Sequence, residues 1–151
     1  MKRVKMDRKH EIVVKAMLIC THNGKVLLQK GSDVKSGSNF YRLIGGHVEF
    51  LEKSDAALKR ELMEELHTRI VNLKLLSVME NMFELKGEKG HEIVFIYSGT
   101  LTNNELYRHD VLGRDEDGRK LKAYWVPFSA LKKERSRVYP KGVYSMISKH
   151  I

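Results

Sequence analysis

Hydrophobic and polar residues alternate in short blocks along most of the chain, a pattern that predicts many β-strands. The most apolar early block, residues 12–20, is expected to form a buried strand. Asn23-Gly24 then signals a tight turn into a second strand at 25–29. Further extended segments are expected at 40–44, 48–50, 70–82, 91–101 and 122–126. The polar stretches between them, 31–39, 86–90 and 102–120, are expected to form loops.

One segment departs from this alternation and follows a helical period. Leu58, Leu62 and Leu66 recur every four residues, which gives a single apolar stripe along a helix from Asp55 to about His67. Ser54 is expected to be its N-cap, because a serine hydroxyl can accept a bond from a free backbone N–H of the first turn. Shorter helices are expected at 128–134 and 141–149.

The same helix carries three carboxylates along one edge. At about 100° per residue, Glu61, Glu64 and Glu65 fall within an arc of about 100°, which borders the leucine stripe. Like charges three or four residues apart repel each other and destabilise an ordinary surface helix. The cluster therefore makes most sense with a cation in front of it. Hard oxygen ligands suit Mg²⁺, with Mn²⁺ as a substitute.

Residues before the cluster stand at fixed intervals from it. The pattern G-x5-E-x7-R-E-apolar-x-E-E is filled by Gly46, Glu52, Arg60, Glu61, Leu62, Glu64 and Glu65. Through this box the chain resembles the Nudix hydrolases, MutT-like enzymes that cut nucleoside diphosphates linked to another group. The box departs from the family at its end, where His67 and Thr68 replace the usual glycine and aliphatic residue. Glycine usually supplies a left-handed helix cap there, which histidine adopts less readily, so the effect of His67 and Thr68 on the loop after the helix stays open.

The resemblance implies a fold and a domain organisation. It implies a single Nudix hydrolase domain over residues 1–151, folded as an α/β/α sandwich with a mixed central sheet. Predicted strands on both sides of one central helix, with another helix at the C-terminus, suit that architecture. The length of 151 residues also suits one domain with a real core.

The resemblance further implies roles for the residues of the box. Glu64 and Glu65 are expected to be the main metal ligands, with the backbone carbonyl of Gly45 as another. Glu61 either binds metal or orients and deprotonates the attacking water, and both roles stay open. The catalytic set is expected to be Glu61, Glu64 and Arg60.

The remaining box residues are expected to support this set. Arg60 can fix a carboxylate by a bidentate bond, and Glu52 would either ligate metal or brace Arg60. Gly46 lets the backbone turn where a side chain would intrude on the metal. A carboxylate from a later loop often completes such sites in the family. Glu116 is the preferred candidate here, and the others are Glu92, Glu80 and Asp110.

Charge and composition narrow the range of partners. The net charge of +9 raises the local concentration of any polyphosphate, so it suits a nucleotide hydrolase. The basic residues are scattered without interleaved aromatics, which disfavours a polynucleotide as partner. No run of about 18 apolar residues exists, so no membrane partner is expected. The lone Cys20 forbids an internal disulfide and fits a cytoplasmic location, in a monomer or a homodimer.

The expected reaction is Mg²⁺-dependent hydrolysis of a phosphoanhydride bond. The substrate is expected to be a small nucleotide, either a nucleoside diphosphate derivative or a nucleoside triphosphate. Residues 82–85 hold neither the proline nor the tyrosine that marks some subgroups of the family, so the choice stays open. Two alternatives also stay open: an RNA 5′-end pyrophosphohydrolase and a non-catalytic nucleotide-sensing Nudix module.

Overall fold

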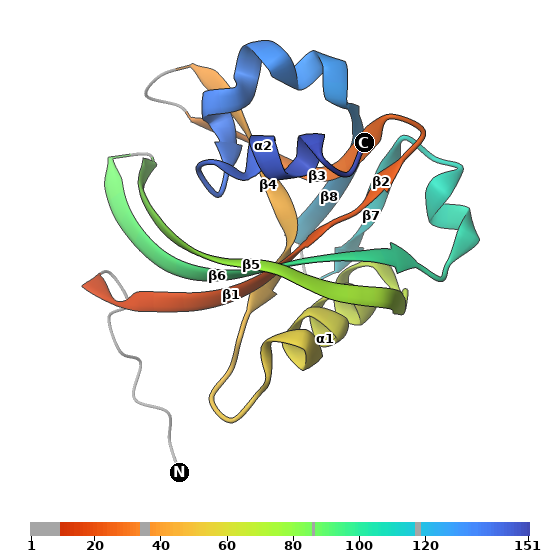
Figure 1. Ribbon diagram of the computed structural model, residues 1–151, viewed down its shortest axis with the longest axis horizontal. Helices are drawn as coiled ribbons and strands as arrows, with labels where there is room; N and C mark the ends of the chain where they lie inside the picture. Colours follow the sequence, from red (N-terminus) through yellow and green to blue (C-terminus); the bar gives the residue numbers. More distant parts are fainter. Residues whose placement is uncertain (1–9, 34–36, 86, 117–118) are drawn as a thin grey trace.

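The computed structural model has a mixed β-sheet with helical layers on both faces (Figure 1). The structure describes residues 10–33, 37–85, 87–116 and 119–151. Within these residues the sheet contains nine strands in the order β5-β6-β1-β4-β3-β8-β7, with β2 beside β3 and β9 beside β4. The strands are β1 Ile12–Ile19, β2 Thr21–His22, β3 Lys25–Asp33, β4 Ser38–His47, β5 Ile70–Leu85, β6 Glu88–Leu101, β7 Val111–Glu116, β8 Arg119–Pro127 and β9 Val138–Tyr139.

The direction of the strands makes this sheet mixed, as predicted. β1 runs parallel to β6, and β4 runs parallel to β9. The pairs β1–β4, β3–β4, β3–β8, β5–β6 and β7–β8 are antiparallel. β4 pairs with β3 along its first half and with β1 along its second half. This central strand therefore leads directly to the loop before the main helix.

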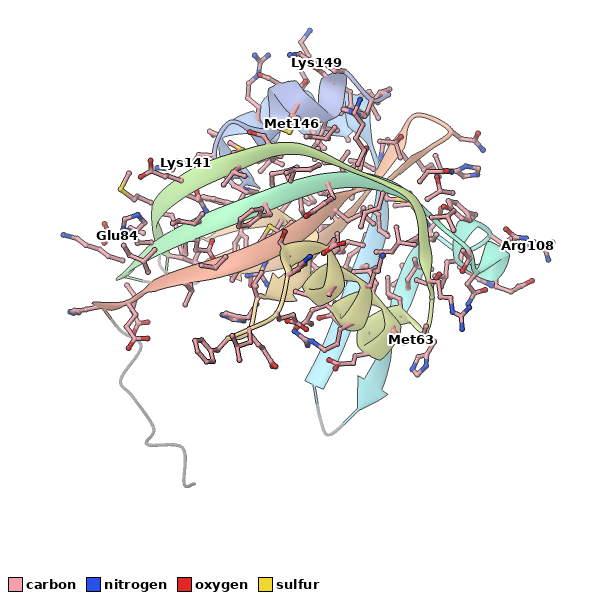
Figure 2. All side chains as sticks on the ribbon, turned by 60° about the horizontal axis from the view of Figure 1, so that its bottom comes forward. Met63, Glu84, Arg108, Lys141, Met146 and Lys149 are labelled. Carbon is pink, nitrogen blue, oxygen red and sulfur yellow. The ribbon has the colours of Figure 1, made fainter. Side chains whose placement is uncertain are left out.

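The two faces of the sheet bury two separate hydrophobic cores. Along β1, the buried residues Ala16 and Leu18 face α1 (Ser54–Leu66), whereas Met17 and Ile19 face the other side. This alternation follows from the two-residue period of a strand. The second core packs against η3 (Phe128–Arg137) and α2 (Val143–Ser148). Figure 2 shows the two layers, with Met63 on α1 and Met146 on α2.

The main helix forms on the predicted stripe, because Ala57, Leu58, Leu62 and Leu66 are its buried residues. Its start differs from the prediction. The N-cap is Lys53, which makes no side-chain cap bond, and Ser54 is the first helical residue. The hydroxyl of Ser54 instead bonds the hydroxyl of Tyr97 at 2.6 Å. The prediction of a Ser54 N-cap was therefore wrong.

Three predicted loops contain strand or helix. β3 extends to Asp33 and β4 begins at Ser38, so the strands take up most of 31–39, and residues 34–36 lie outside the described part. The expected loop at 86–90 is mostly the start of β6. The expected loop at 102–120 contains the short 3-10 helix η2 (Asn104–Tyr107) and strand β7. Conversely, residues 48–50 form no strand. No helix of the described residues is long and apolar enough to cross a membrane.

Candidate active site

Arg60, in the middle of α1, is the centre of an ion-pair cluster. Its guanidinium donates to both carboxylate oxygens of Glu52, from Nε at 2.8 Å and from Nη2 at 3.0 Å. Nη2 also donates to the backbone oxygen of His47, and Nη1 donates to Glu61 Oε1 at 3.1 Å. These charge-assisted bonds to Glu52 and Glu61 hold the pKa of Arg60 above its usual range. The bonds tie the loop before α1 to the helix.

Glu52 contacts the guanidinium of Arg60 with both oxygens, so in this structure it acts as a brace. The hydrogen bond from Arg60 is the main cause that lowers the pKa of Glu52. A second bond, from the backbone N–H of Glu49 to Glu52 Oε1 at 3.1 Å, acts in the same direction. Of the two roles that the sequence left open for Glu52, the contacts match the brace.

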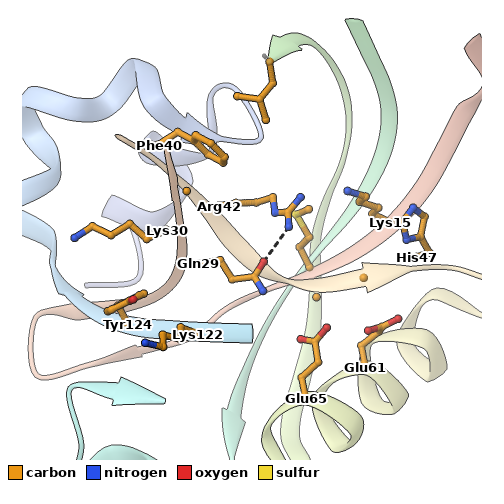
Figure 3. A pocket seen from close by; sticks show the side chains of 15 residues that line it. Lys15, Gln29, Lys30, Phe40, Arg42, His47, Glu61, Glu65, Lys122 and Tyr124 are labelled. Atoms are coloured by element: carbon orange, nitrogen blue, oxygen red, sulfur yellow. Dashed lines mark hydrogen bonds between the residues drawn. The ribbon is translucent and has the colours of Figure 1, made fainter. Parts of the chain in front are cut away.

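The three helix carboxylates do not share one orientation. Glu61 and Glu65 line a common cavity, and both project toward it in Figure 3. Glu64 is exposed, and its carboxylate lies 3.5 Å from Nη1 of Arg60. The same nitrogen contacts Glu61, so Arg60 holds two of the three carboxylates close together.

Gly46 allows the closest approach between the sheet and this helix. A Cβ atom at this position would overlap the carboxylate of Glu61. At Gly45 the φ angle is +145°, and a Cβ there would overlap the backbone oxygen of Ala16 in β1. Both glycines line the cavity. Only residues without a side chain therefore let β4 pass between β1 and the carboxylates.

Glu65 is held in an environment that favours its protonated form. Partial burial, a hydrogen bond with Glu61 and the negative charge of Glu61 raise the pKa of Glu65 from 4.5 to about 8. Arg42 acts in the opposite direction, because its positive charge lowers that pKa. The proximity of Glu61 therefore disfavours ionisation of Glu65 in the absence of a bound cation.

This carboxylate pair fits a divalent cation by its chemistry. Two carboxylates close enough to share a proton repel each other when both are ionised, and a divalent cation removes that repulsion. Within the described residues, no group of three or more His, Cys, Asp or Glu side chains converges as a metal site. The donors that the cavity offers are Glu61 and Glu65, with Gly45 beside them. A metal at this point would keep several positions for water and substrate oxygens, as Mg²⁺ does.

The cavity in front of the carboxylates has a volume of about 740 Å³. Its walls come from β1, β3, β4, β5, β8 and α1. Four of its lining residues carry positive charge: Lys15, Lys30, Arg42 and Lys122. Arg42 donates to Gln29 Oε1 at 3.1 Å in the middle of the cavity. The cavity therefore has two carboxylates of α1 at one end and these four basic side chains, here called the positive wall, along the rest.

Sequence reasoning missed this positive wall. Its residues stand on four strands and are separated by up to about a hundred positions in the sequence, so no local motif connects them. Their only shared signal is a basic residue within or beside a predicted strand. The strand pairing in the sheet brings them together.

The candidates for a later carboxylate ligand lie in different surroundings. Glu92 is buried and engaged by Lys15 and by the amide of Asn81, so its two oxygens already have partners. Asp110 is exposed and pairs with Lys25 at 3.1 Å. Glu116 ends β7, and its side chain lies outside the described part of the structure. Among the described residues, neither Glu92 nor Asp110 lines the cavity.

Comparison with known proteins identifies the family. A family model described as NUDIX domain matches residues 9–145. The chain therefore belongs to the NUDIX family and is a Nudix hydrolase, a pyrophosphohydrolase of nucleotide derivatives. The resemblance that the box indicated is confirmed.

Solved structures of similar fold support the architecture. A MutT NUDIX hydrolase from Burkholderia pseudomallei has a TM-score of 0.57 and 23% identity, over 80% of this chain and 86% of that chain. The MutT protein from Methanosarcina mazei Go1 has a TM-score of 0.58 and 15% identity, over 92% of this chain and 94% of that chain. A NUDIX hydrolase from Nitrosomonas europaea has a TM-score of 0.57 and 14% identity, over 92% and 87%. The predicted α/β/α sandwich with a mixed sheet is confirmed.

Proposed function

We propose that this protein hydrolyses a phosphoanhydride bond of a nucleoside diphosphate derivative or nucleoside triphosphate, with Mg²⁺ as cofactor and Mn²⁺ as a substitute. One observation carries the proposal. A single cavity is lined at one end by the Glu61–Glu65 pair and along its wall by basic side chains. A divalent cation suits the first end, and the phosphates of a nucleotide suit the second.

The residues of the box have different roles in this proposal. Glu64 and Glu65, with the carbonyl of Gly45, would hold the metal, and Glu61 would either share it or accept the proton of the attacking water. When bound, the metal neutralises neighbouring phosphoryl oxygens and lowers the pKa of a coordinated water. Arg60 keeps Glu61 and Glu64 in place through the contacts described above.

A substrate screen tests the proposed reaction. Purified protein is incubated with ADP-ribose, diadenosine tetraphosphate and nucleoside triphosphates, with Mg²⁺ or with a chelator, and phosphate and pyrophosphate release is measured. At least one of these compounds should be cleaved, and only with the divalent cation. In ¹⁸O-labelled water, the label should appear on a phosphorus of the anhydride. Efficient turnover of p-nitrophenyl phosphate with no action on any pyrophosphate would contradict the proposal. Binding of a nucleotide without turnover would indicate a sensing module.

Matched variants test the proposed site. Glu61→Gln, Glu64→Gln and Glu65→Gln keep side-chain volume and remove one negative charge each. Loss of a metal ligand or of the base should lower turnover by at least about 10²-fold. Glu105→Gln is the control, because Glu105 is exposed on η2 and pairs only with surface residues. Near-full activity of the Glu64 and Glu65 variants with Mg²⁺ would show that the metal assignment is wrong.

A further inference from the structure

Two lysines that line the cavity have no carboxylate partner within the part of the chain that the structure describes. Lys30 on β3 and Lys122 on β8 both line it, and both are exposed. Among the described residues, no carboxylate lies within 4.0 Å of either ammonium group. By contrast, Lys15 in the same cavity is paired with Glu92, and outside the cavity Lys25 is paired with Asp110 and Arg60 with Glu52.

The two lysines lie away from the carboxylate end. Figure 3 shows Lys30 and Lys122 on one side of the Arg42–Gln29 hydrogen bond and Lys15 on the other. Glu61 projects from α1 on the Lys15 side of that bond, and Glu65 projects from α1 below it. Because Lys30 and Glu61 lie on opposite sides of this bond, a phosphate held by Lys30 and Lys122 would be a different phosphate from one bound in front of Glu61.

Aromatic rings hold Lys30 in position. Its Nζ lies 5.5 Å from the ring centroid of Tyr124 and 5.8 Å from that of Tyr41. These are cation–π distances, so the long side chain is restrained without neutralisation of its charge. Lys30 also occupies the space over the Tyr124 ring, where a nucleobase would otherwise stack. This end of the cavity is therefore suited to an anion and poorly suited to an uncharged base.

We propose that Lys30 and Lys122 form a second anion subsite, which binds a phosphate beyond the anhydride that the enzyme cleaves. This inference rests on the proposed function, because it assigns the substrate class for the same site. Preferred substrates then carry at least one phosphate more than a simple diphosphate ester. The extra phosphate either extends the polyphosphate chain or is attached to a ribose. In both cases the two lysines would contact an anionic phosphate group.

Two matched substrate pairs distinguish these sources. NADH and NADPH share one pyrophosphate and differ by a single ribose phosphate. Diadenosine diphosphate and diadenosine tetraphosphate differ in the length of the chain. For wild-type protein, kcat/KM should be at least about tenfold higher for the more phosphorylated member of at least one pair, because charge-assisted bonds to phosphate are strong. The pair that shows the difference identifies the source of the extra phosphate.

The variant Lys30→Met/Lys122→Met removes both charges and keeps most of each apolar stem. The preference for the extra phosphate should then fall at least about tenfold, mainly through KM, because the lost contact is with the substrate. The kcat/KM for the less phosphorylated member should fall by a smaller factor than that for the more phosphorylated member, because the extra phosphate is the group that the two lysines contact. A charge-matched control, Lys25→Met/Lys132→Met, removes two lysines that do not line the cavity. The control should keep the wild-type preference.

A binding measurement separates this proposal from the proposed function. Calorimetric titration of the same four compounds in a chelator needs no turnover. Wild-type protein should bind the more phosphorylated member at least about tenfold tighter in the pair that shows the effect, and the Lys30→Met/Lys122→Met variant should not. Such binding without hydrolysis under any condition would leave the subsite standing and would contradict the proposed function. Equal effects of the cavity variant and the control, or no preference in the wild type, would overturn the subsite.

Discussion

Lys15 and Glu92 form an ion pair inside the sheet, between the parallel strands β1 and β6, with Nζ and Oε2 2.5 Å apart. The side chains are 12% and 5% exposed. Asn81 donates to the other oxygen of Glu92 at 3.1 Å and accepts from the backbone N–H of Lys141 at 3.2 Å. Residues of three strands therefore contact one another at the buried carboxylate of Glu92. Asn81 also links them to the segment before α2.

Breaking this pair from one side should strongly destabilise the protein. Lys15→Met leaves an uncompensated buried carboxylate, and Glu92→Gln leaves an uncompensated ammonium, so each should lower the free energy of unfolding by about 3–5 kcal/mol. The double variant Lys15→Met/Glu92→Leu removes both charges and should lose much less. Urea denaturation followed by circular dichroism measures all three.

The exposed pair Lys25–Asp110 is the control for this comparison. Its side chains are 39% and 82% exposed, so Lys25→Met should change stability by at most about 1 kcal/mol. Equal losses at the buried and the exposed pair would contradict the reading of Lys15 and Glu92 as a structural pair.

Glu65 should make the metal-free protein less stable as pH rises. Its pKa is raised to about 8 in the folded state, against an ordinary value of 4.5. Between these values the folded protein holds a proton that the unfolded chain releases, so the free energy of unfolding falls with pH across this window. Below the window both states are protonated, and above it the loss is complete.

Thermal melts in chelator from pH 4 to pH 9 check this pH dependence of Glu65. Glu65→Gln should flatten the fall and should melt above the wild type near pH 8. Added Mg²⁺ should raise the melting temperature of the wild type most at high pH, where Glu65 is ionised. A fall of the same size in the variant would exclude Glu65 as its cause.

The sequence predicted the helix and its box because their residues are close along the chain. Leu58, Leu62 and Leu66 share one helical face, and the carboxylates border it, so a period of 3.6 residues is sufficient to place them. The prediction of Ser54 as the N-cap was wrong because of a contact with a distant residue. The hydroxyl of Ser54 is bonded by Tyr97, a residue 43 positions later, which no local pattern indicates.

The missed strand segments have physical causes too. Gly31 and Gly90 indicated loops, yet each lies in a strand opposite an aromatic residue, Phe40 and Phe83 respectively. A Cβ at either glycine would overlap that ring, so the glycines provide space for aromatic packing inside the sheet. β7 lies at the edge of the sheet with a polar sequence, and it lacks the alternation that marks a half-buried strand.

The contact between Glu52 and Arg60 should matter more for metal binding than for folding. Glu52→Gln removes the negative charge that binds Nε and Nη2 of Arg60. The guanidinium is then free to shift relative to Glu61 and Glu64. Loss of such a supporting partner typically costs about 10–100-fold in metal affinity or activity. The Mg²⁺ concentration for half-maximal activity should therefore rise within that range.

Arg60→Lys tests the same contact from the other side. Lysine keeps the positive charge but cannot make the bidentate bond, so its Mg²⁺ requirement should also rise. Circular dichroism spectra should stay unchanged in both variants. A wild-type Mg²⁺ requirement in Glu52→Gln would show that the brace has no part in metal binding.

His67 takes the left-handed conformation in which the family usually has glycine. Its φ and ψ are 50° and 47°, and its N–H donates to the backbone oxygen of Met63 to close the helix. His67→Gly should be neutral or mildly stabilising, because relief of the left-handed strain offsets the larger backbone entropy of glycine. His67→Ala removes the same side-chain atoms beyond Cβ and should be less stable than His67→Gly by about 1 kcal/mol. Thermal melts compare them, and equal stability would contradict the strain argument. Loss of activity without loss of stability would implicate His67 in substrate contact.

Leu51 offers a cleaner test of backbone strain beside the same site. Its φ is +65°, and its side chain is 91% exposed, so the strain is not compensated by burial. Leu51→Gly relieves the strain and loses almost no packing, whereas Leu51→Ala loses the side chain and keeps the strain. Leu51→Gly should therefore raise the free energy of unfolding above that of Leu51→Ala by about 1 kcal/mol, since left-handed backbone costs about that much in residues with a Cβ. Urea denaturation of the two variants measures the difference. If Leu51→Ala proves as stable as Leu51→Gly, the loop before α1 has a different conformation in solution.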